Sequence, residues 1–467
     1  MPDPADLTVA DAARAIARRD LSPVDLTRAC LARIEARNPA LNAFVTVVPE
    51  RALEEAARAE AELLAGQYRG PLHGIPIGLK DLYDTAGIET AAGSAVLRGR
   101  VPDRDAAAVA RLREAGAVIL GKTNTHEFAW GTTTNNPHTG PTRNPWAPDR
   151  IPGGSSGGSG AAVAARLCPA ALGTDTGGSI RIPAALCGVV GLKPTFGRVS
   201  RAGIIPMSWQ FDHAGPITRT VEDAAILLAA IAGYDPADFA TVPVPVPDYR
   251  AALVPDIRGL RIGVPRDQFF GLLDPEVLVA VEEALETLRG LGAAVEDIDA
   301  GFTREQVISA WRLVNVEGRL YHAPWLEQQP EAYSEELRNV LLQPLPEPLD
   351  LSAAYLASYE IKEGVRRVLE TVDLLAAPTT MRPASAIGED PVEVEGVQLS
   401  TGAAFASLTM PFNLAGVPAV SIPCGFSAEG LPIGLQLAGR PFDEGTVLRA
   451  AFAYECATEW RRRTPPL

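Results

Sequence analysis

Residue types that often reveal a function are scarce in this sequence of 467 residues. The cysteines are widely spaced and form no CxxC pair, which argues against a zinc site and against a disulfide framework. The histidines form no HExxH pair, so no metal site is predicted. We therefore expect buried, reduced thiols in a cytoplasmic protein. The thiols in question are Cys30, Cys168, Cys187, Cys424 and Cys456.

The sequence also has fewer basic than acidic residues and no long apolar run. Lysine and arginine total 42 against 57 aspartate and glutamate, and the formal net charge is −15. Such a surface has no field that attracts phosphate backbones or anionic membranes. No apolar run approaches the roughly 18 residues of a membrane span, and the N-terminus lacks the apolar core of a secretory signal. The sequence predicts neither nucleic acid nor membrane as a partner.

What the chain does contain is the composition of an ordinary globular protein, with 47% hydrophobic and 21% charged residues. Short apolar runs alternate with helical patterns along its length, which predicts an α/β fold. We expect a single large domain over residues 1–467, with a mixed, mostly buried β-sheet covered by helices on both faces. The expected strands are 75–79, 118–120, 260–264, 373–378 and 419–423. The expected helices include 51–65, 105–115, 221–232, 276–291, 304–317, 352–371 and 444–461.

The densest unusual chemistry lies in residues 152–181, where glycines flank serines twice. Glycine allows a close approach of backbone to ligand, so two such loops suggest hydroxyls and amides that converge on one point. A flexible Gly/Ser linker is the plain alternative. Core-forming sequence continues directly from both loops, and this context disfavours a linker.

Two pattern matches in the chain are misleading. Residues 116–123 fit the phosphate-loop pattern GxxxxGK[ST], but their middle residues are apolar and predict a strand. The pattern GxSxG occurs twice, centred on Ser155 and Ser156. A nucleophile elbow needs a preceding strand and a partner histidine, and three prolines precede this loop. A Ser-His-Asp esterase that uses His213 or His322 stays open as a lesser alternative.

Taken together, three runs of sequence resemble the amidase signature family. They are GIPIGLKDLYDTAG at 74–87, GGSSGGSGAAVAA at 153–165 and GTDTGGSIRIPAALCGVVGLKPTFGRVS at 173–200. The resemblance extends to FNLAGVPAVSIP at 412–423 and is weakest over 240–370. It implies a signature core at about 65–225 and a variable substrate-pocket region at about 240–370.

The resemblance also implies a role for individual residues. It places the family's lysine on Lys80, its bridging serine (preceded by a cis peptide) on Ser155, and its acylated serine on Ser179. It assigns the oxyanion hole to the backbone N–H groups of Thr176, Gly177, Gly178 and Ser179. It aligns Ala129, less specifically, with a substrate-contact position. No metal and no organic cofactor takes part.

Lysine chemistry in this role requires an uncharged amine. A free lysine titrates near pH 10.4, and a general base needs a pKa of about 7–8. Burial of Lys80 after the apolar run IPIGL would supply this shift, and Asp81 should face the other side of the strand. Ser156 is expected to brace the loop, and Asp175 is expected to pair with Arg181.

The substrate is less well specified than the reaction. We expect a small-molecule amide that is hydrolysed to an acid plus ammonia or an amine, with a homodimer left open. Aromatic residues of the variable region are candidates for the acyl pocket, although packing between helices is the favoured explanation for any one of them. They are Trp311, Tyr321, Trp325 and Tyr333.

Two further alternatives concern function. One branch of the family is the glutamine-hydrolysing subunit of a tRNA-dependent amidotransferase, in which an acidic residue usually holds the substrate ammonium. That position is Ala406 here, and an alanine cannot hold an ammonium, so a stand-alone amidase is favoured. A catalytically silent protein that binds a partner is disfavoured by the intact Lys80, Ser155 and Ser179.

Overall fold

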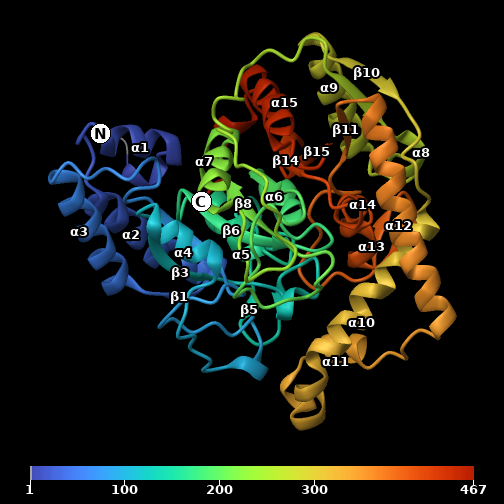
Figure 1. The fold of residues 1–467 in the computed structure, drawn as a ribbon, viewed down its shortest axis with the longest axis horizontal. Coiled ribbons are helices and arrows are strands. Elements are labelled where there is room, and N and C mark those ends of the chain that lie inside the picture. Colours follow the sequence, from blue (N-terminus) through green and yellow to red (C-terminus); the bar gives the residue numbers. More distant parts are fainter. Residues whose placement is uncertain (1–2) are drawn as a thin grey trace.

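The α/β fold class is confirmed by a computed structural model, which describes residues 3–467 (Figure 1). Within these residues one mixed sheet of eleven strands takes strands from both halves of the chain. Its order is β1-β3-β2-β6-β8-β7-β14-β15-β11-β9-β10. The strands are β1 (Phe44–Val47), β2 (Pro76–Lys80), β3 (Val118–Thr123), β6 (Ala170–Asp175), β7 (Val190–Lys193), β8 (His213–Thr218), β9 (Arg261–Val264), β10 (Ala294–Asp297), β11 (Leu374–Pro378), β14 (Ala419–Phe426) and β15 (Pro432–Gly439). Two short hairpins lie outside it, β4 (Asn135–Asn136) with β5 (Gly140–Pro141) and β12 (Val392–Val394) with β13 (Val397–Leu399).

Parallel pairing near one edge of the sheet positions the candidate lysine. Strand β2 runs parallel to both β3 and β6, with Lys80 opposite Thr123 and Leu79 opposite Leu172. Strand β6 is antiparallel to β8 on its other side. The ends of β2 and β6 therefore lie together. The Ser179 loop follows β6 directly, and the Ser155 loop contacts both strand ends, Lys80 through Ser155 and Thr174 through Ser156.

Helices of very different exposure surround the sheet. They are α1 (Val9–Ala17), α2 (Pro23–Leu41), α3 (Pro49–Leu64), α4 (Ala107–Glu114), α5 (Gly157–Ala164), α6 (Arg181–Cys187), α7 (Val221–Ile231), α8 (Arg266–Phe269), α9 (Pro275–Gly290), α10 (Arg304–Gln328), α11 (Glu335–Leu341), α12 (Pro348–Thr371), α13 (Thr401–Ala406), α14 (Met410–Leu414) and α15 (Glu444–Ala457). Short 3₁₀ turns lie at Pro4–Asp6, Ala95–Leu97, Glu127–Ala129, Pro330–Ala332 and Trp460–Arg462.

The sheet carries helices on both faces, as expected. On β15, a methyl group at Gly434 would meet Ala185 of α6, whereas one at Gly439 would meet Val447 of α15. Positions five apart on a strand point to opposite faces, so α6 and α15 cover different sides. Helix α5 packs beside α6, and α7 packs beside α15. All residues of α5 and α6 are buried, which is why their sequences show no polar stripe.

The structure differs from the expected elements in both halves. Six strands of the sheet were not among the expected ones, namely β1, β6, β7, β8, β10 and β15. Helix α10 runs to Gln328 and not to residue 317, and Pro324 lies inside it without ending it. Together α10, α11 and α12 form the lower and right-hand margin of the view in Figure 1. Four cysteines are buried, but Cys456 is exposed, contrary to the expectation for all five. Among the helices of residues 3–467, none combines the length and apolar character that crossing a bilayer requires.

Candidate active site

Lys80 ends strand β2 and reaches two hydroxyl groups in the interior. Its Nζ lies 2.7 Å from Ser155 Oγ and 2.8 Å from Thr174 Oγ1. Lys80 and Ser155 are both fully buried. Among residues 3–467 the amine thus has two neutral oxygen partners and no carboxylate in direct contact.

Burial sets the acid–base behaviour of this amine. Loss of hydration lowers the pKa of Lys80 to about 7, although the negative charges of Asp212 and Asp175 act in the opposite direction. The carboxylate of Asp81 faces away and accepts N–H bonds from Ala91 and Gly93, as expected for the next residue along the chain. A substantial fraction of Lys80 is therefore uncharged at neutral pH, as a proton acceptor must be.

The loop that carries Ser155 is held tightly from both sides. The Gly154–Ser155 peptide is cis, as the resemblance implies. A methyl group on Gly154 would lie 2.8 Å from the Thr132 backbone, so this position has no space for a side chain. Ser156 braces the loop as expected: its hydroxyl donates to the Thr174 carbonyl at 3.2 Å, and the Thr174 N–H donates to it at 3.3 Å.

A second loop, which carries Ser179, is braced by a buried ion pair. Arg181 contacts Asp175 through both Nε and Nη2 at 3.0 Å, which confirms the expected pairing. The Arg181 guanidinium holds the pKa of Asp175 well below its usual range, against the opposing effect of burial. Arg181 also donates to Gln436 and Asn413. The loop geometry therefore rests on a charged network that links β6, α6, α14 and β15.

This network modifies the predicted oxyanion hole. The Gly178 N–H donates to Asp175 Oδ1 at 2.8 Å, so that amide already has a partner. Gly178 takes a φ of +131°, and a methyl group there would meet Thr409 Oγ1 at 2.1 Å. Its role is to shape the loop. Thr176, Gly177 and Ser179 remain the candidate amides for an oxyanion.

The two catalytic serines predicted by resemblance lie on adjoining loops. The Ser156 N–H donates to the Ser179 carbonyl at 3.3 Å, which joins the loops through their backbones. Within residues 3–467 the hydroxyls of Ser155 and Ser179 form no hydrogen bond with each other. Catalytic hydrogen bonds are often long before a substrate binds, so this leaves the predicted relay as a prediction.

Ser179 opens into a cavity of about 300 Å³. Ala129, Gly177 and Ser179 line this cavity, whereas Thr176 and Gly178 do not. Of the four aromatic candidates, Trp311 lines it, and the other three lie elsewhere. The remaining lining residues are Trp130, Gly131, Thr132, Ile182, Met207, Asn315, Val340, Gln343, Gly402, Ala406 and Met410. No residue that lines the cavity carries a charge.

The histidines offer no alternative base. His213 Nδ1 faces the carbonyls of Phe211 and Asp175, and burial lowers its pKa well below the usual range. His322 Nδ1 contacts the Tyr333 hydroxyl, and burial lowers its pKa to about 3. In the described part of the chain no serine hydroxyl is hydrogen-bonded to a histidine ring. A Ser-His-Asp arrangement is therefore absent from residues 3–467.

Two residues of the site escaped the sequence reasoning. Thr174 is a direct partner of Lys80. Side chains alternate between the two faces of a strand, and this alternation along β6 is the signal that could have identified Thr174. Asp212 accepts a hydrogen bond of 2.5 Å from Thr176 Oγ1 and also faces the amides of Met207 and Ser208. It lies 36 residues from Thr176 in the sequence, and no local pattern marks it.

The site thus combines a buried lysine that contacts one serine hydroxyl with a second serine on the adjoining loop. Hydrolases that use a Ser-Lys pair in place of a Ser-His-Asp triad are a known class. A family model described as "Amidase" matches residues 25–448, and the chain belongs to this family. It is thus an enzyme that acts on amide C–N bonds.

Named relatives fall into two groups. The chain is 44% identical to a glutamyl-tRNA(Gln) amidotransferase subunit of Geobacter metallireducens, over 97% of this chain and 98% of the relative. The structure of the corresponding glutamyl-tRNA(Gln) amidotransferase subunit of Thermotoga maritima is 34% identical, with a TM-score of 0.80 over 97% of this chain and 95% of that one. A bacterial aryl acylamidase of the amidase signature family is 29% identical, with a TM-score of 0.89 over 98% of this chain and 97% of that one.

The first group contradicts the expected partners. We expected a small-molecule amide as the only ligand, no nucleic acid, and at most a homodimer. This expectation was wrong, because close relatives are named as one subunit of an enzyme for glutamyl-tRNA(Gln). The error has a physical reason. Net charge describes the surface of this chain alone and says nothing of a surface that another subunit brings.

Proposed function

We propose that the chain hydrolyses a carboxylic amide through an acyl-Ser179 intermediate, with Lys80 as the base and Ser155 as the proton relay. The observation that carries this proposal is the 2.7 Å contact between Lys80 Nζ and Ser155 Oγ in a fully buried site. A hydroxyl is a weak nucleophile until a base takes its proton, and Lys80 is the amine with a suitable pKa and position.

Proton transfers follow from the order of these groups. Neutral Lys80 takes the proton of Ser155 as Ser155 takes that of Ser179, and Ser179 Oγ attacks the amide carbonyl. The oxyanion receives hydrogen bonds from the loop amides, a device commonly worth about 10²–10³ in rate per donor. The relay returns the proton to the leaving nitrogen, which departs as ammonia or an amine. Water then attacks the acyl-Ser179 ester by the same relay and releases the acid.

The named relatives favour the amidotransferase subunit, which was the lesser of the two functions inferred from the sequence. We propose that the amide hydrolysed is glutamine and that the chain acts as the amide-hydrolysing subunit of a tRNA-dependent amidotransferase. Support comes from full-length similarity to proteins of that name at 44% and 45% identity. In this setting any contact with tRNA can belong to a partner subunit, which fits the acidic balance of this chain.

One observation favours a second candidate, an amidase for amides with an uncharged acyl group. The cavity at Ser179 is lined without a charged residue, and Ala406 stands where the amidotransferase branch usually has an acid. The α-ammonium of free glutamine would have no counter-charge there, and burying an unpaired charge is costly. The likeness to an aryl acylamidase supports this candidate.

A substrate panel distinguishes these functions. The purified chain is assayed with glutamine, a primary alkyl amide, an anilide and a peptide C-terminal amide, and ammonia or amine release is scored. Ser179→Ala serves as the folded control, and mass spectrometry detects the acyl adduct on Ser179. Turnover of glutamine alone, by the chain or by the complex purified with its natural partners, supports the amidotransferase role. Turnover of alkyl or aryl amides supports the second candidate. Turnover that survives in Ser179→Ala would refute the acyl-Ser179 mechanism, whichever amide is hydrolysed.

A further inference from the structure

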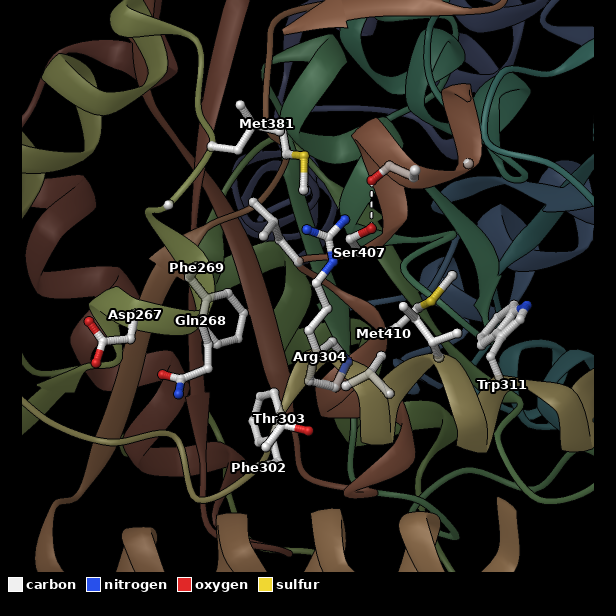
Figure 2. A pocket seen from close by; sticks show the side chains of 18 residues that line it. Asp267, Gln268, Phe269, Phe302, Thr303, Arg304, Trp311, Met381, Ser407 and Met410 are labelled. Carbon is white, nitrogen blue, oxygen red and sulfur yellow. Dashed lines mark hydrogen bonds between the residues drawn. The ribbon is translucent and has the colours of Figure 1, made fainter. Parts of the chain in front are cut away.

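A larger cavity adjoins the pocket of Ser179 (Figure 2). Its volume is about 560 Å³, within the range of about 300–1,000 Å³ that small-molecule sites usually occupy. It shares Trp311, Gly402 and Met410 with the Ser179 pocket. The two cavities are therefore neighbouring compartments that share part of their lining.

The larger compartment combines an apolar lining with one unpaired cation. Phe269, Phe302, Val307 and Met381 contribute apolar surface. Figure 2 shows Arg304, the first residue of α10, reaching across the compartment. Its guanidinium forms no ion pair and donates no hydrogen bond within residues 3–467.

The acidic residues nearby leave this guanidinium free. Asp267 also lines the compartment, but Figure 2 places its carboxylate at the opposite margin, away from Arg304. Glu305 follows Arg304 in the sequence. Hydrogen bonds to its own amide and to Thr303, together with the positive charge of Arg304, lower the pKa of Glu305, but the two side chains form no ion pair within residues 3–467. A guanidinium over an apolar floor fits a carboxylate, which it can bind with two parallel hydrogen bonds.

The partition between the compartments touches the catalytic loop. A methyl group on Gly177 would meet the Trp311 ring at 2.7 Å and the Met410 side chain at 3.3 Å. The same two residues also line the compartment of Arg304. A ligand in the Arg304 compartment that contacts Trp311 and Met410 therefore lies next to side chains that pack on the loop of Ser179.

We propose that the Arg304 compartment binds the remote, carboxylate-bearing end of the substrate, so that the preferred substrates are amides with an apolar spacer and a distal anion. This inference rests on one part of the proposed function, the placement of the amide at Ser179. It names a substrate class that differs from both glutamine and an amide with an uncharged acyl group. The spacer lies on the apolar lining, and the carboxylate accepts hydrogen bonds from the Arg304 guanidinium.

The first experiment compares two amides of matched length, octanedioic acid monoamide and octanamide. The readout is the ratio of their kcat/KM values, because a general loss of activity cancels in a ratio. The ratio should favour the monoamide and fall at least about tenfold in Arg304→Gln, as expected for loss of a charge-assisted hydrogen bond. Arg312→Gln is the matched control, since Arg312 lies on the same helix, lines neither compartment and faces Asp350 at 3.9 Å. An equal ratio in the parent chain and both variants would overturn the proposal.

A second experiment separates this inference from the catalytic proposal. Octanedioate, which has no amide, is titrated calorimetrically into the Ser179→Ala protein, with or without Arg304→Gln. Binding that is weakened at least about tenfold by Arg304→Gln supports the compartment even if Ser179 proves not to be the nucleophile. No binding, or binding that is the same in both proteins, would count against the compartment whatever the outcome of the turnover assays.

Discussion

Two buried lysines on neighbouring parallel strands have different surroundings. Lys80 ends β2, and Lys122 lies in β3 opposite Leu79. Both side chains are fully buried. Lys80 donates to the hydroxyls of Ser155 and Thr174, whereas Lys122 donates to the backbone carbonyl of Tyr83.

The comparison shows that a lowered pKa alone does not identify a catalytic base. Burial lowers the pKa of Lys80 to about 7 and that of Lys122 to about 8. A carbonyl has no proton to give, so Lys122 can only stabilise its surroundings. A hydroxyl can pass its proton on, and Ser155 lies beside the loop of Ser179. The partner of the amine, and not its acidity, separates the two roles.

The largest effect should come from the same substitution at both lysines. Lys80→Met should lower kcat/KM by about 10³-fold or more, because the serine relay loses its base. Lys122→Met should lower it far less, since no reacting group contacts Lys122. Steady-state rates per folded molecule, with circular dichroism to measure the folded fraction, test this difference. Equal losses in both variants would assign Lys80 a structural role.

The pH dependence of the reaction should report Lys80 alone. Protonated Lys80 cannot accept a proton, so kcat/KM should fall about tenfold per pH unit below the pKa of about 7 and level off above it. Lys122→Met should keep this profile. Rates between about pH 5 and 9, in buffers of constant ionic strength, provide the measurement. A flat profile would contradict a lysine base.

A smaller effect concerns folding stability, to which both lysines contribute. Each has a folded pKa below the unfolded value of 10.5, so the unfolded chain binds more protons between the two values. Stability relative to the matching Met variant should therefore rise with pH in that window, by up to roughly 1 kcal/mol per unit. The rise should begin near pH 7 for Lys80 and near pH 8 for Lys122. Urea midpoints of both pairs at half-unit steps from about pH 6 to 9.5 would show whether the two onsets differ.

How far the sequence predicts this site depends on how local each feature is. Lys80 follows a run of apolar residues, and its burial could be inferred from that run. The pairing of Asp175 with Arg181 spans one loop and was also predictable. Asp212 reaches Thr176 only because β8 lies beside β6, a pairing of strands that no residue pattern specifies. The engaged amide of Gly178 was missed for a related reason, since a carboxylate's choice among nearby N–H donors depends on exact loop geometry.

The smallest effect tests which charges each lysine senses. After burial, the charge that most affects the pKa of Lys80 is Asp212, and for Lys122 it is Asp81; both act to raise it. Asp212→Asn should therefore move the acidic limb of the kcat/KM profile to lower pH by a fraction of a unit, while Asp81→Asn should leave the limb in place. Each amide keeps an oxygen that can accept a hydrogen bond, so the change is chiefly one of charge. Because Asp212 also accepts a hydrogen bond from Thr176, Asp212→Asn should lower kcat at every pH. The decisive measurement is therefore the pH at which kcat/KM falls, and not the absolute value of kcat/KM. A limb that moves with Asp81→Asn and not with Asp212→Asn would mean that the titrating amine is Lys122.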